Sequence, residues 1–377
     1  MTPPRPISRG LLIFALLLFM QGCGSQNSPT VCNSNCGGTP GAEFLYGVPA
    51  NSLLNTFVTA SINLTTGGFS SVSITTPPIL SSNGIVVMDA RFLYVSVGTQ
   101  IFGYSINPAT GGITPLSGSP FGLAAGHAPQ GLAATPNSYL LYTADAAGGI
   151  DAFHVDSSTG VLSAISGSPF GSGKDYQVTV DSSGRFLYAT DSVDGEILAF
   201  TIGSSGALTP IPGSPFALPG RAASKPYGIL DTGSFLYTAL GSFNQIAAFS
   251  VNSTTGALTA VPGSPFAAGK NPATLALSGH FLYVVNDEDG DISGYIVDSS
   301  SGALTPIPGS PFFSGGSVAS IATEPSGKYL YLSASAGIIG CNIDSSTGAL
   351  STGAASVSND GTLWLTVMQI PPTAPQN

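Results

Sequence analysis

The sequence has very few charged side chains. Asp, Glu, Lys and Arg make up 7% of its 377 residues, whereas about 25% is usual in a soluble domain. Exposed helices take most of their surface from Glu, Lys and Arg, so this chain lacks the residues that long surface helices need. Glycine and proline are abundant instead, with 49 and 29 copies, and they favour turns between short elements. The composition predicts an all-β protein.

Positive charge is especially scarce. The 9 Lys and Arg residues face 19 Asp and Glu residues, which gives a formal net charge of −10. Nucleic acids and anionic membrane surfaces attract basic proteins, so we expect neither to bind the folded body. Histidine occurs 3 times and cysteine 4 times. These residues form no zinc-ligand pattern, and we predict neither a metal nor a cofactor.

The first 22 residues have the pattern of an export signal. Two arginines precede an apolar run from Leu11 to Met20, which is too short for a permanent membrane helix. The tetrapeptide MQGC, ending at Cys23, then resembles a bacterial lipobox. We expect residues 1–22 to be removed and Cys23 to be lipidated, so that the lipid alone holds the protein at the bacterial cell envelope (the outer membrane if Gram-negative). The alternative is an ordinary signal peptide and a periplasmic or secreted protein.

Residues 23–42 form a linker rich in Gly, Ser, Asn and Pro. Cys32 and Cys36 lie within it, and they could form a local disulfide after export. Two cysteines alone make a poor zinc site, because structural zinc takes four ligands and no histidine lies near. Cys341 replaces an apolar residue in a strand-like run, so we expect it to be buried.

The rest of the chain is a repeated unit. Each copy contains an aromatic triplet that ends in Tyr and, further on, a polar turn that ends in Gly. The triplets end at Tyr46, Tyr94, Tyr142, Tyr188, Tyr237, Tyr283 and Tyr331. The turns end at Gly67, Gly111, Gly160, Gly206, Gly256, Gly302 and Gly348. The triplets are 46 to 49 residues apart, which is the length of a four-stranded blade. We predict a seven-bladed β-propeller over residues 43–370, followed by a tail at 371–377.

Each repeat divides into four short strands: a small apolar inner strand, the triplet, an alternating third strand and an outer strand. The motif Gly-Ser-Pro-Phe recurs where the outer strand is expected. Because Pro cannot donate a hydrogen bond to a sheet, we place this motif on the outer edge. We expect its Phe to pack between neighbouring blades. The motif contains Pro120 and Phe121, Pro169 and Phe170, Pro215 and Phe216, Pro265 and Phe266, and Pro311 and Phe312.

The two ends of the repeat region are unequal. The first triplet, which ends at Tyr46, has only the linker before it, whereas residues 362–370 form a strand with no partner in the last repeat. We therefore predict that residues 362–370 supply the inner strand of the first blade. A shared blade would remove the free edges of an open ring.

The repeats resemble the lactonase-like seven-bladed propellers, a family that includes bacterial 6-phosphogluconolactonase and fungal carboxymuconate cyclase. The resemblance covers about residues 44–370. It rests on Gly-x-Phe-Leu-Tyr, as at 184–188, on the Thr-Gly-x-Leu turn, and on a Pro that opens the inner strand. It implies the propeller fold and, in enzymatic members, hydrolysis of a lactone at the central mouth. Those members carry His-Pro-x-Glu before an inner strand and Asn-Arg after an aromatic strand.

This chain departs from that pattern at both places. The inner-strand entries read NPAT at 271–274 and KPYG at 225–228, and Asn286-Asp287 follows an aromatic strand. His127 lies two residues before a Pro. Hydrolysis needs a group that activates water and a donor for the developing oxyanion. Since the matching positions do not provide this set, the catalytic residues stay unassigned.

Charged residues gather in the loops of one predicted mouth. In a propeller, the connections into the inner strands and the loops between second and third strands open on the same side. Four of the seven Lys and Arg residues that follow the export signal lie in the connections, and acids such as Asp145 lie in the loops. We predict a ligand site here, made by His127, Lys174, Asp191, Asp194, Arg221, Lys225, Lys270, Asn286, Asp287 and Asp289. The alternative is a set of solvated loop charges with no ligand.

Two acidic loops, 191–196 and 286–291, have a second interpretation as calcium sites. Calcium takes six to eight oxygen ligands, and neither loop has the EF-hand spacing. Each loop also contains Asp-Gly, which is a strong turn signal by itself. We predict turns here and no metal.

Two functions are compatible with these patterns. The first is a binding module at the cell envelope, whose ligand would be a sugar acid, a lactone, another polar small molecule or an envelope protein. The second, implied by the resemblance, is a lactone hydrolase of the 6-phosphogluconolactonase type. An exported location argues against a cytosolic sugar-phosphate substrate. Hydrolysis of a sugar lactone above the spontaneous rate would distinguish the two.

Overall fold

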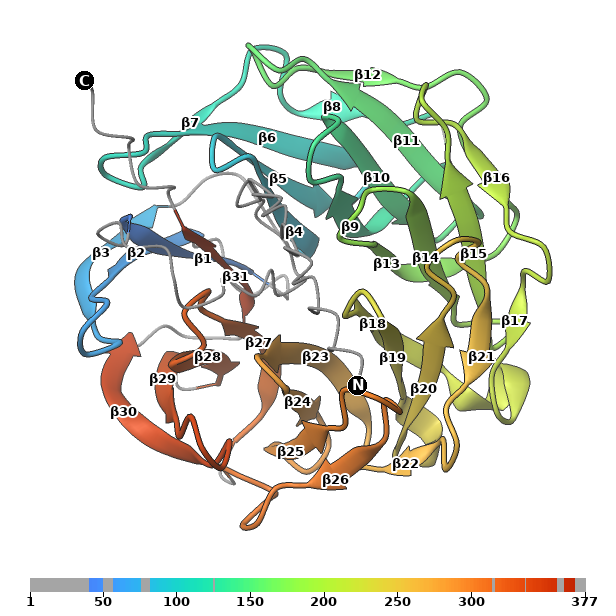
Figure 1. Cartoon of the computed structure of the whole chain (residues 1–377). Helices are drawn as coiled ribbons and strands as arrows, with labels where there is room; N and C mark the ends of the chain where they lie inside the picture. The colour runs from blue at the N-terminus through green and yellow to red at the C-terminus, as the bar shows by residue number, and fades with distance from the viewer. Residues whose placement is uncertain are drawn as a thin grey trace, which may run out of the picture.

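The structure is a computed structural model that describes residues 41–49, 57–75, 82–124, 126–313, 316–335, 337–357 and 363–369. These residues form seven antiparallel sheets arranged in a ring around a central axis (Figure 1). The seven-bladed propeller predicted from the repeat is confirmed. The predicted export signal, Cys23, Cys32, Cys36 and the tail 371–377 lie outside the described residues. In the described part, no helix combines the length and apolar character needed to cross a membrane.

Each blade has four strands, which we call inner, second, third and outer from the axis outward, and the blades are numbered 1 to 7 in the chain order of their second strands. In the order of blades 1 to 7, the inner strands are β31 (Leu363–Gln369), β4 (Ser82–Met88), β9 (Pro129–Ala134), β13 (Asp175–Val180), β18 (Pro226–Asp231), β23 (Pro272–Ser278) and β27 (Val318–Thr323). The second strands are β1 (Glu43–Pro49), β5 (Phe92–Val97), β10 (Leu140–Asp145), β14 (Phe186–Asp191), β19 (Phe235–Leu240), β24 (Phe281–Asn286) and β28 (Tyr329–Ala334). The third strands are β2 (Phe57–Ile62), β6 (Gln100–Ile106), β11 (Ile150–Val155), β15 (Glu196–Ile202), β20 (Gln245–Val251), β25 (Asp291–Val297) and β29 (Gly337–Ile343). The outer strands are β3 (Phe69–Thr75), β7 (Ile113–Pro115), β12 (Leu162–Ala164), β16 (Leu208–Pro210), β21 (Leu258–Ala260), β26 (Leu304–Pro306) and β30 (Leu350–Val357).

A few shorter elements also occur in the described residues. Two-residue strands lie beside the third strand of three blades, and two short 3₁₀ helices lie in the loops of blade 5. These elements are β8 (Phe121–Gly122), β17 (Phe216–Ala217), β22 (Phe266–Ala267), η1 (Arg221–Ser224) and η2 (Gly241–Phe243).

The core lies between the blades. The second strands are buried along their whole length, apart from Val97 at the end of β5, because each blade is covered on both faces by its neighbours. Each hydrophobic cluster spans two successive blades; one, for example, joins Tyr142 of blade 3 to Phe200 of blade 4. Cys341 of β29 is buried in such a cluster, as predicted.

The Tyr and the Gly that mark the repeat are partners in one hydrogen bond. The hydroxyl of each triplet Tyr donates to the carbonyl of the turn Gly in the next blade, over 2.7–2.9 Å. The last bond runs from Tyr331 to Gly67, so the series closes around the ring. The repeated motifs therefore specify contacts between blades as well as strands within them.

The turn position requires glycine. At Gly302, φ is 74°, a left-handed conformation that side chains rarely adopt, and a Cβ there would lie 2.3 Å from the ring of Phe235. Phe235, which opens the triplet of blade 5, thus covers the turn of blade 6. Both backbone conformation and close packing exclude a larger residue.

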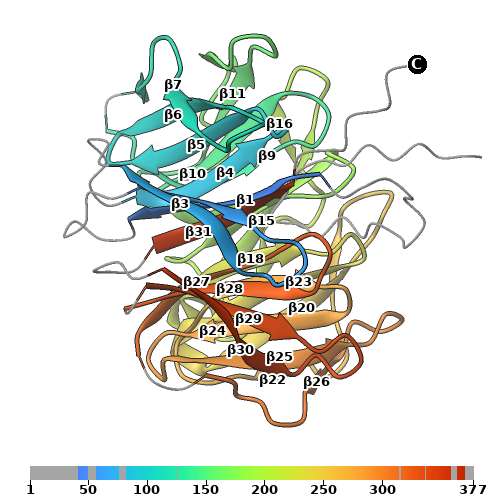
Figure 2. The same cartoon turned by 90° about the vertical axis from the view of Figure 1, so that its left-hand side faces the viewer.

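The predicted closure of the ring is also confirmed. β31 pairs with β1 from Glu43 opposite Gln369 to Pro49 opposite Leu363, and the two strands lie side by side in Figure 2. The indole Nε1 of Trp364 donates to the carbonyl of Ser82 in blade 2, over 2.9 Å. The C-terminal strand therefore completes blade 1 and joins it to the next blade.

The Gly-Ser-Pro-Phe motif lies at the outer edge of the sheet, beside the third strand, as predicted, but it follows the outer strand instead of forming part of it. In blade 4 the outer strand ends at Pro210, and the chain then turns back so that Phe216 pairs with Ile197. The hydroxyl of Ser214 accepts the N–H of Ala199, over 2.9 Å. The reason is that a three-residue outer strand covers only half of the third strand, and the motif covers the rest.

The predicted packing of the motif phenylalanines is confirmed. Phe170, for example, packs against the cluster shared by blades 3 and 4, and Phe266 packs against the cluster shared by blades 5 and 6. The motif thus contributes to the core while it covers an exposed sheet edge.

Candidate functional site

A cavity of about 410 Å³ lies on the propeller axis, lined by residues of all seven inner strands or of the loops beside them. Six of these strands have an irregularity in their pairing near the end at which they begin. Such bulges re-aim side chains, and here they lie at the entrance to the axis. The polar residues of the lining are Gln177, Tyr227, Asn271, Thr274, Asp287, Ser317 and Ser320, and Trp364 adds an aromatic surface.

Asn271 and Asp287 form a pair in this lining. The Nδ2 of Asn271 donates to the Oδ2 of Asp287 over 3.2 Å, and the N–H of Asp287 donates to the carbonyl of Asn271 over 3.0 Å. Asn271 has φ of 52°, a conformation that Asn tolerates better than most residues. These two residues occupy the places where the sequence departs from the lactonase pattern. The structure thus brings both departures together at the axis.

None of the predicted cations is among the lining residues of this cavity. The Nη1 of Arg221 is 3.9 Å from the Oε2 of Glu196, and the Nζ of Lys270 is 3.9 Å from Glu288 and 3.8 Å from Asp289. The Arg221 and Lys270 side chains are 69% and 59% exposed. Lys174 and Lys225 are also exposed. No Lys or Arg occurs among the cavity-lining residues in the described part of the chain.

The predicted acids and Asn286 divide into two kinds. Asp191 and Asn286 are buried and hold loops together. The carboxylate of Asp191 accepts the N–H groups of Lys174, Val193 and Asp194, while the Nδ2 of Asn286 donates to Asp291 and Ser293.

Asp194 and Asp289 are nearer the surface. Asp194 is exposed, and Asp289 accepts the N–H of Lys270 over 2.7 Å. These contacts join connection loops to the neighbouring loops between second and third strands, so the two loop sets do meet at one mouth. Ligand binding by the predicted set as a whole stays a prediction.

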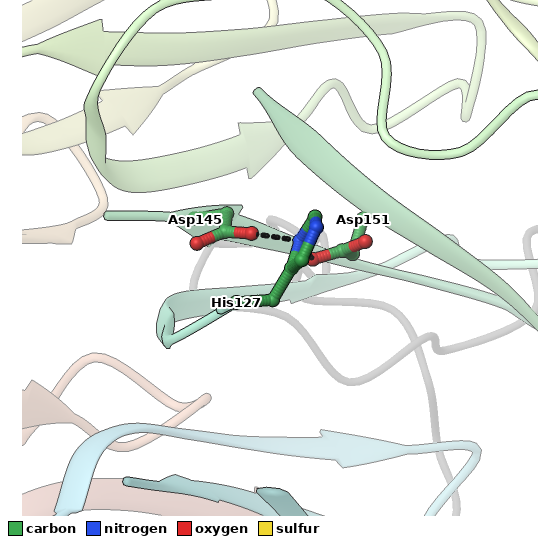
Figure 3. A group of neighbouring side chains, drawn as sticks. All are labelled: His127, Asp145 and Asp151. Atoms are coloured by element: carbon green, nitrogen blue, oxygen red, sulfur yellow. Dashed lines mark hydrogen bonds and ion pairs between the residues drawn. The ribbon is translucent and has the colours of Figure 1, made fainter. Parts of the chain in front are cut away.

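His127 belongs to a separate cluster in blade 3 (Figure 3). It lies in the connection before β9, and its Nδ1 contacts the Oδ2 of Asp145, at the end of β10. The same Nδ1 is 3.1 Å from the Oδ2 of Asp151, in β11. Burial lowers the pKa of His127, but hydrogen bonds and charge from Asp151 and Asp145 outweigh it and raise this pKa overall. The two carboxylates therefore favour a protonated imidazole.

Sequence analysis did not single out Asp151, Gln177, Tyr227 or Trp364. Asp151 had a visible signal, because other blades have Phe102, Leu198, Ala247, Ser293 and Ile339 at its repeat position. A lone acid in that set indicates a local role. Gln177, Tyr227 and Trp364 had no such signal, since the inner strands vary from blade to blade.

The comparisons with known proteins agree with this architecture. The family model described as "Lactonase, 7-bladed beta-propeller" matches residues 83–213 and 228–312. Similar solved structures include a candidate 6-phosphogluconolactonase from Bacteroides fragilis, at 19% identity and a TM-score of 0.71, over 86% of this chain and 98% of that one. A periplasmic gluconolactonase from Pseudomonas aeruginosa matches at 17% identity and a TM-score of 0.70, over 88% and 99%.

At such low identity these structures support the fold alone. No curated protein matches the chain significantly. The family model covers more than half of the sequence. The chain therefore belongs to the seven-bladed β-propeller lactonase family.

Proposed function

We propose that the protein binds a small, neutral, hydroxyl-rich molecule, such as a sugar lactone, in the axial cavity. The observation that carries this proposal is the lining: amide, hydroxyl and aromatic side chains with Asp287 as the charged group. Amides and hydroxyls can donate and accept hydrogen bonds, as sugar hydroxyls require. Cavities that combine apolar walls with a few polar groups are common ligand sites.

The charge of the lining favours a neutral ligand over a sugar acid. Asp287 would repel a carboxylate or phosphate, and no lining Lys or Arg in the described residues offsets that repulsion. Two of the predicted cations contact acids outside the lining instead: Arg221 contacts Glu196, and Lys270 contacts Glu288 and Asp289. We therefore narrow the predicted ligand class from sugar acids and lactones to neutral lactones and related polyols.

Lactone hydrolysis is a second candidate, favoured by the carboxylate in the cavity. Asp287 could accept a proton from an attacking water, and the Asn271 amide beside it could donate to the developing oxyanion. Family membership and the names of the two similar structures point to the same reaction. Both candidate functions require that the ligand binds in the axial cavity.

We also propose that the propeller is exported and held at the cell envelope by lipid on Cys23. This proposal is supported by the N-terminal sequence pattern. Replacing Cys23 with Ser should move the protein from the membrane fraction to the soluble fraction. A variant that stays in the membrane fraction would show that Cys23 is not the anchor.

The ligand proposal can be tested with the single tryptophan of the chain, Trp364, which lines the cavity. Titration with glucono-δ-lactone should change its fluorescence saturably, while sodium gluconate should cause little change. Asp287→Asn should make the responses to the lactone and to gluconate more alike, because it removes the charge that repels gluconate. Asp289→Asn is the matched control, because Asp289 is not among the lining residues.

Acid release measured in the same samples tests hydrolysis. If the protein is a hydrolase, the rate should exceed the spontaneous rate and fall by about a hundredfold or more in Asp287→Asn, as is typical for loss of a general base. Tighter binding of gluconate than of the lactone, or no fluorescence change with either, would overturn the binding proposal.

A further inference from the structure

Three side chains of blade 3 direct ligand atoms to one point. His127, Asp145 and Asp151 come from a connection loop and two adjacent strands, and Figure 3 shows them facing one another. Their Nδ1 and carboxylate oxygen atoms all lie within 4.8 Å of one another. None of the three residues is in the lining of the axial cavity, so this cluster is distinct from the proposed ligand site.

Each carboxylate uses one oxygen to hold its position and turns the other toward His127. The Oδ1 of Asp145 accepts the N–H groups of Ala128 and Ala147, over 3.0 and 2.8 Å. The Oδ1 of Asp151 accepts the hydroxyl of Ser168 over 3.4 Å. The Oδ2 of both residues contacts the Nδ1 of His127. In metal sites, the side chains that bind the metal are typically oriented by a hydrogen bond to the atom that does not bind it.

The imidazole alone cannot satisfy these two oxygens. A single Nδ1 carries at most one hydrogen, whereas two Oδ2 atoms face it. Asp145 and Asp151 are 0% and 6% exposed, and the Oδ2 of Asp145 accepts no other hydrogen bond from the described residues. No Lys or Arg forms an ion pair with either acid within that part of the chain. Two buried carboxylates carry one more negative charge than a protonated His127 can offset, so a bound cation would compensate them.

We propose that His127, Asp145 and Asp151 bind one divalent transition-metal ion, of which zinc and manganese are the best fits. One imidazole nitrogen and two carboxylate oxygens are a ligand set that such ions accept. The His127 side chain is 17% exposed, which leaves an open side for a water ligand. Calcium fits poorly, because it takes six to eight oxygen ligands.

The test is metal binding by the full protein without any sugar ligand. Protein stripped with EDTA is titrated with zinc chloride, manganese chloride and calcium chloride, and bound metal and melting temperature are measured. We expect the protein to bind one more equivalent of zinc or manganese than His127→Ala does, and to melt at a higher temperature when loaded. Asp151→Asn should lower the affinity at least tenfold.

Two controls make the result specific. His154→Gln removes an exposed histidine from the same strand, β11, and should leave metal binding unchanged. Circular dichroism of the metal-free variants checks that each is folded, and His127→Ala carries the test if Asp151→Asn, a change at a buried residue, prevents folding. The proposal would be overturned if His127→Ala bound as much zinc and manganese as the unaltered protein does. It would also be overturned if the unaltered protein bound calcium more tightly than zinc and manganese. The sugar titration above is independent, so the two proposals can fail separately.

Discussion

Tyr188 and Gly256 show how single residues act in this fold. The Tyr hydroxyl lies in the core, where its hydrogen bond to the Gly256 carbonyl over 2.8 Å satisfies two buried polar groups at once. Burial raises the pKa of this phenol well above its ordinary value, so it stays a donor at any ordinary pH. The same bond recurs between each pair of neighbouring blades.

Tyr188→Phe should therefore destabilise the protein measurably. The substitution removes the donor but leaves the Gly256 carbonyl buried, which costs about 1–3 kcal/mol. Urea unfolding followed by circular dichroism would measure the loss. Tyr139→Phe is the control: Tyr139 is partly exposed and bonds to exposed Asp89, so water can replace that partner. Equal losses of stability in the two variants would show that the inter-blade hydrogen bond stabilises the protein no more than an exposed one does.

At the scale of strands and loops, features that recur in every blade could be predicted from the sequence, whereas features that differ between blades could not. The Tyr triplets and Gly turns recur because every blade needs the same contacts with the next, and they gave the fold, the strand order and the closure by β31. The Gly-Ser-Pro-Phe motif was misplaced, since proline indicates an edge but does not say which segment forms it. Asn271 and Asp287 were identified individually, but only the folded ring brings these residues together.

The seam between blades 7 and 1 contains two acids that sequence analysis did not identify. Glu43 of β1 is 1% exposed, and Glu324 follows β27. Glu324 accepts the N–H groups of Ser326 and Lys328 over 2.7 and 2.6 Å. Burial first, and then the charge of Glu324, raise the pKa of Glu43 from 4.5 to about 8. Glu43 is therefore protonated in the folded protein at neutral pH.

This shift predicts that stability falls as pH rises. Between pH 4.5 and about 8 the folded protein holds a proton on Glu43 that the unfolded chain has released, so raising the pH favours unfolding; above about pH 8 this group adds no further loss. Asp231, whose pKa burial raises to about 7, acts in the same direction.

Glu43→Gln should flatten part of this decline in stability, because the amide does not titrate whereas Asp231 still does. The amide oxygen can still accept the hydrogen bond from the Nε2 of Gln369. Melting temperatures measured between pH 5 and pH 9 would show the change. Glu288→Gln, at a side chain that is 66% exposed, should keep the original slope. A decline of equal steepness in Glu43→Gln would contradict the assignment.

At the scale of the whole molecule, closure depends on the strand farthest from the start of the chain. β31 pairs along all seven residues of β1, and Ser320 and Ser333 of blade 7 hydrogen bond to its backbone. On the other side, Trp364 bonds to blade 2. A ring in which every blade is covered by two neighbours has no blade that can be lost alone, so the strand stabilises contacts on both sides of the seam.

Deleting residues 362–377 should therefore destabilise the entire ring. Loss of β31 exposes the inner edge of β1 and the clusters that contain Leu363, Leu365 and Met368. We expect a large fall in melting temperature and faster hydrogen exchange in all blades, with blade 4, opposite the seam, included. Deleting only residues 371–377 is the control and should change neither. Faster exchange confined to blade 1, with an unchanged melting temperature, would show that the propeller tolerates an open seam and that the C-terminal strand stabilises one blade only.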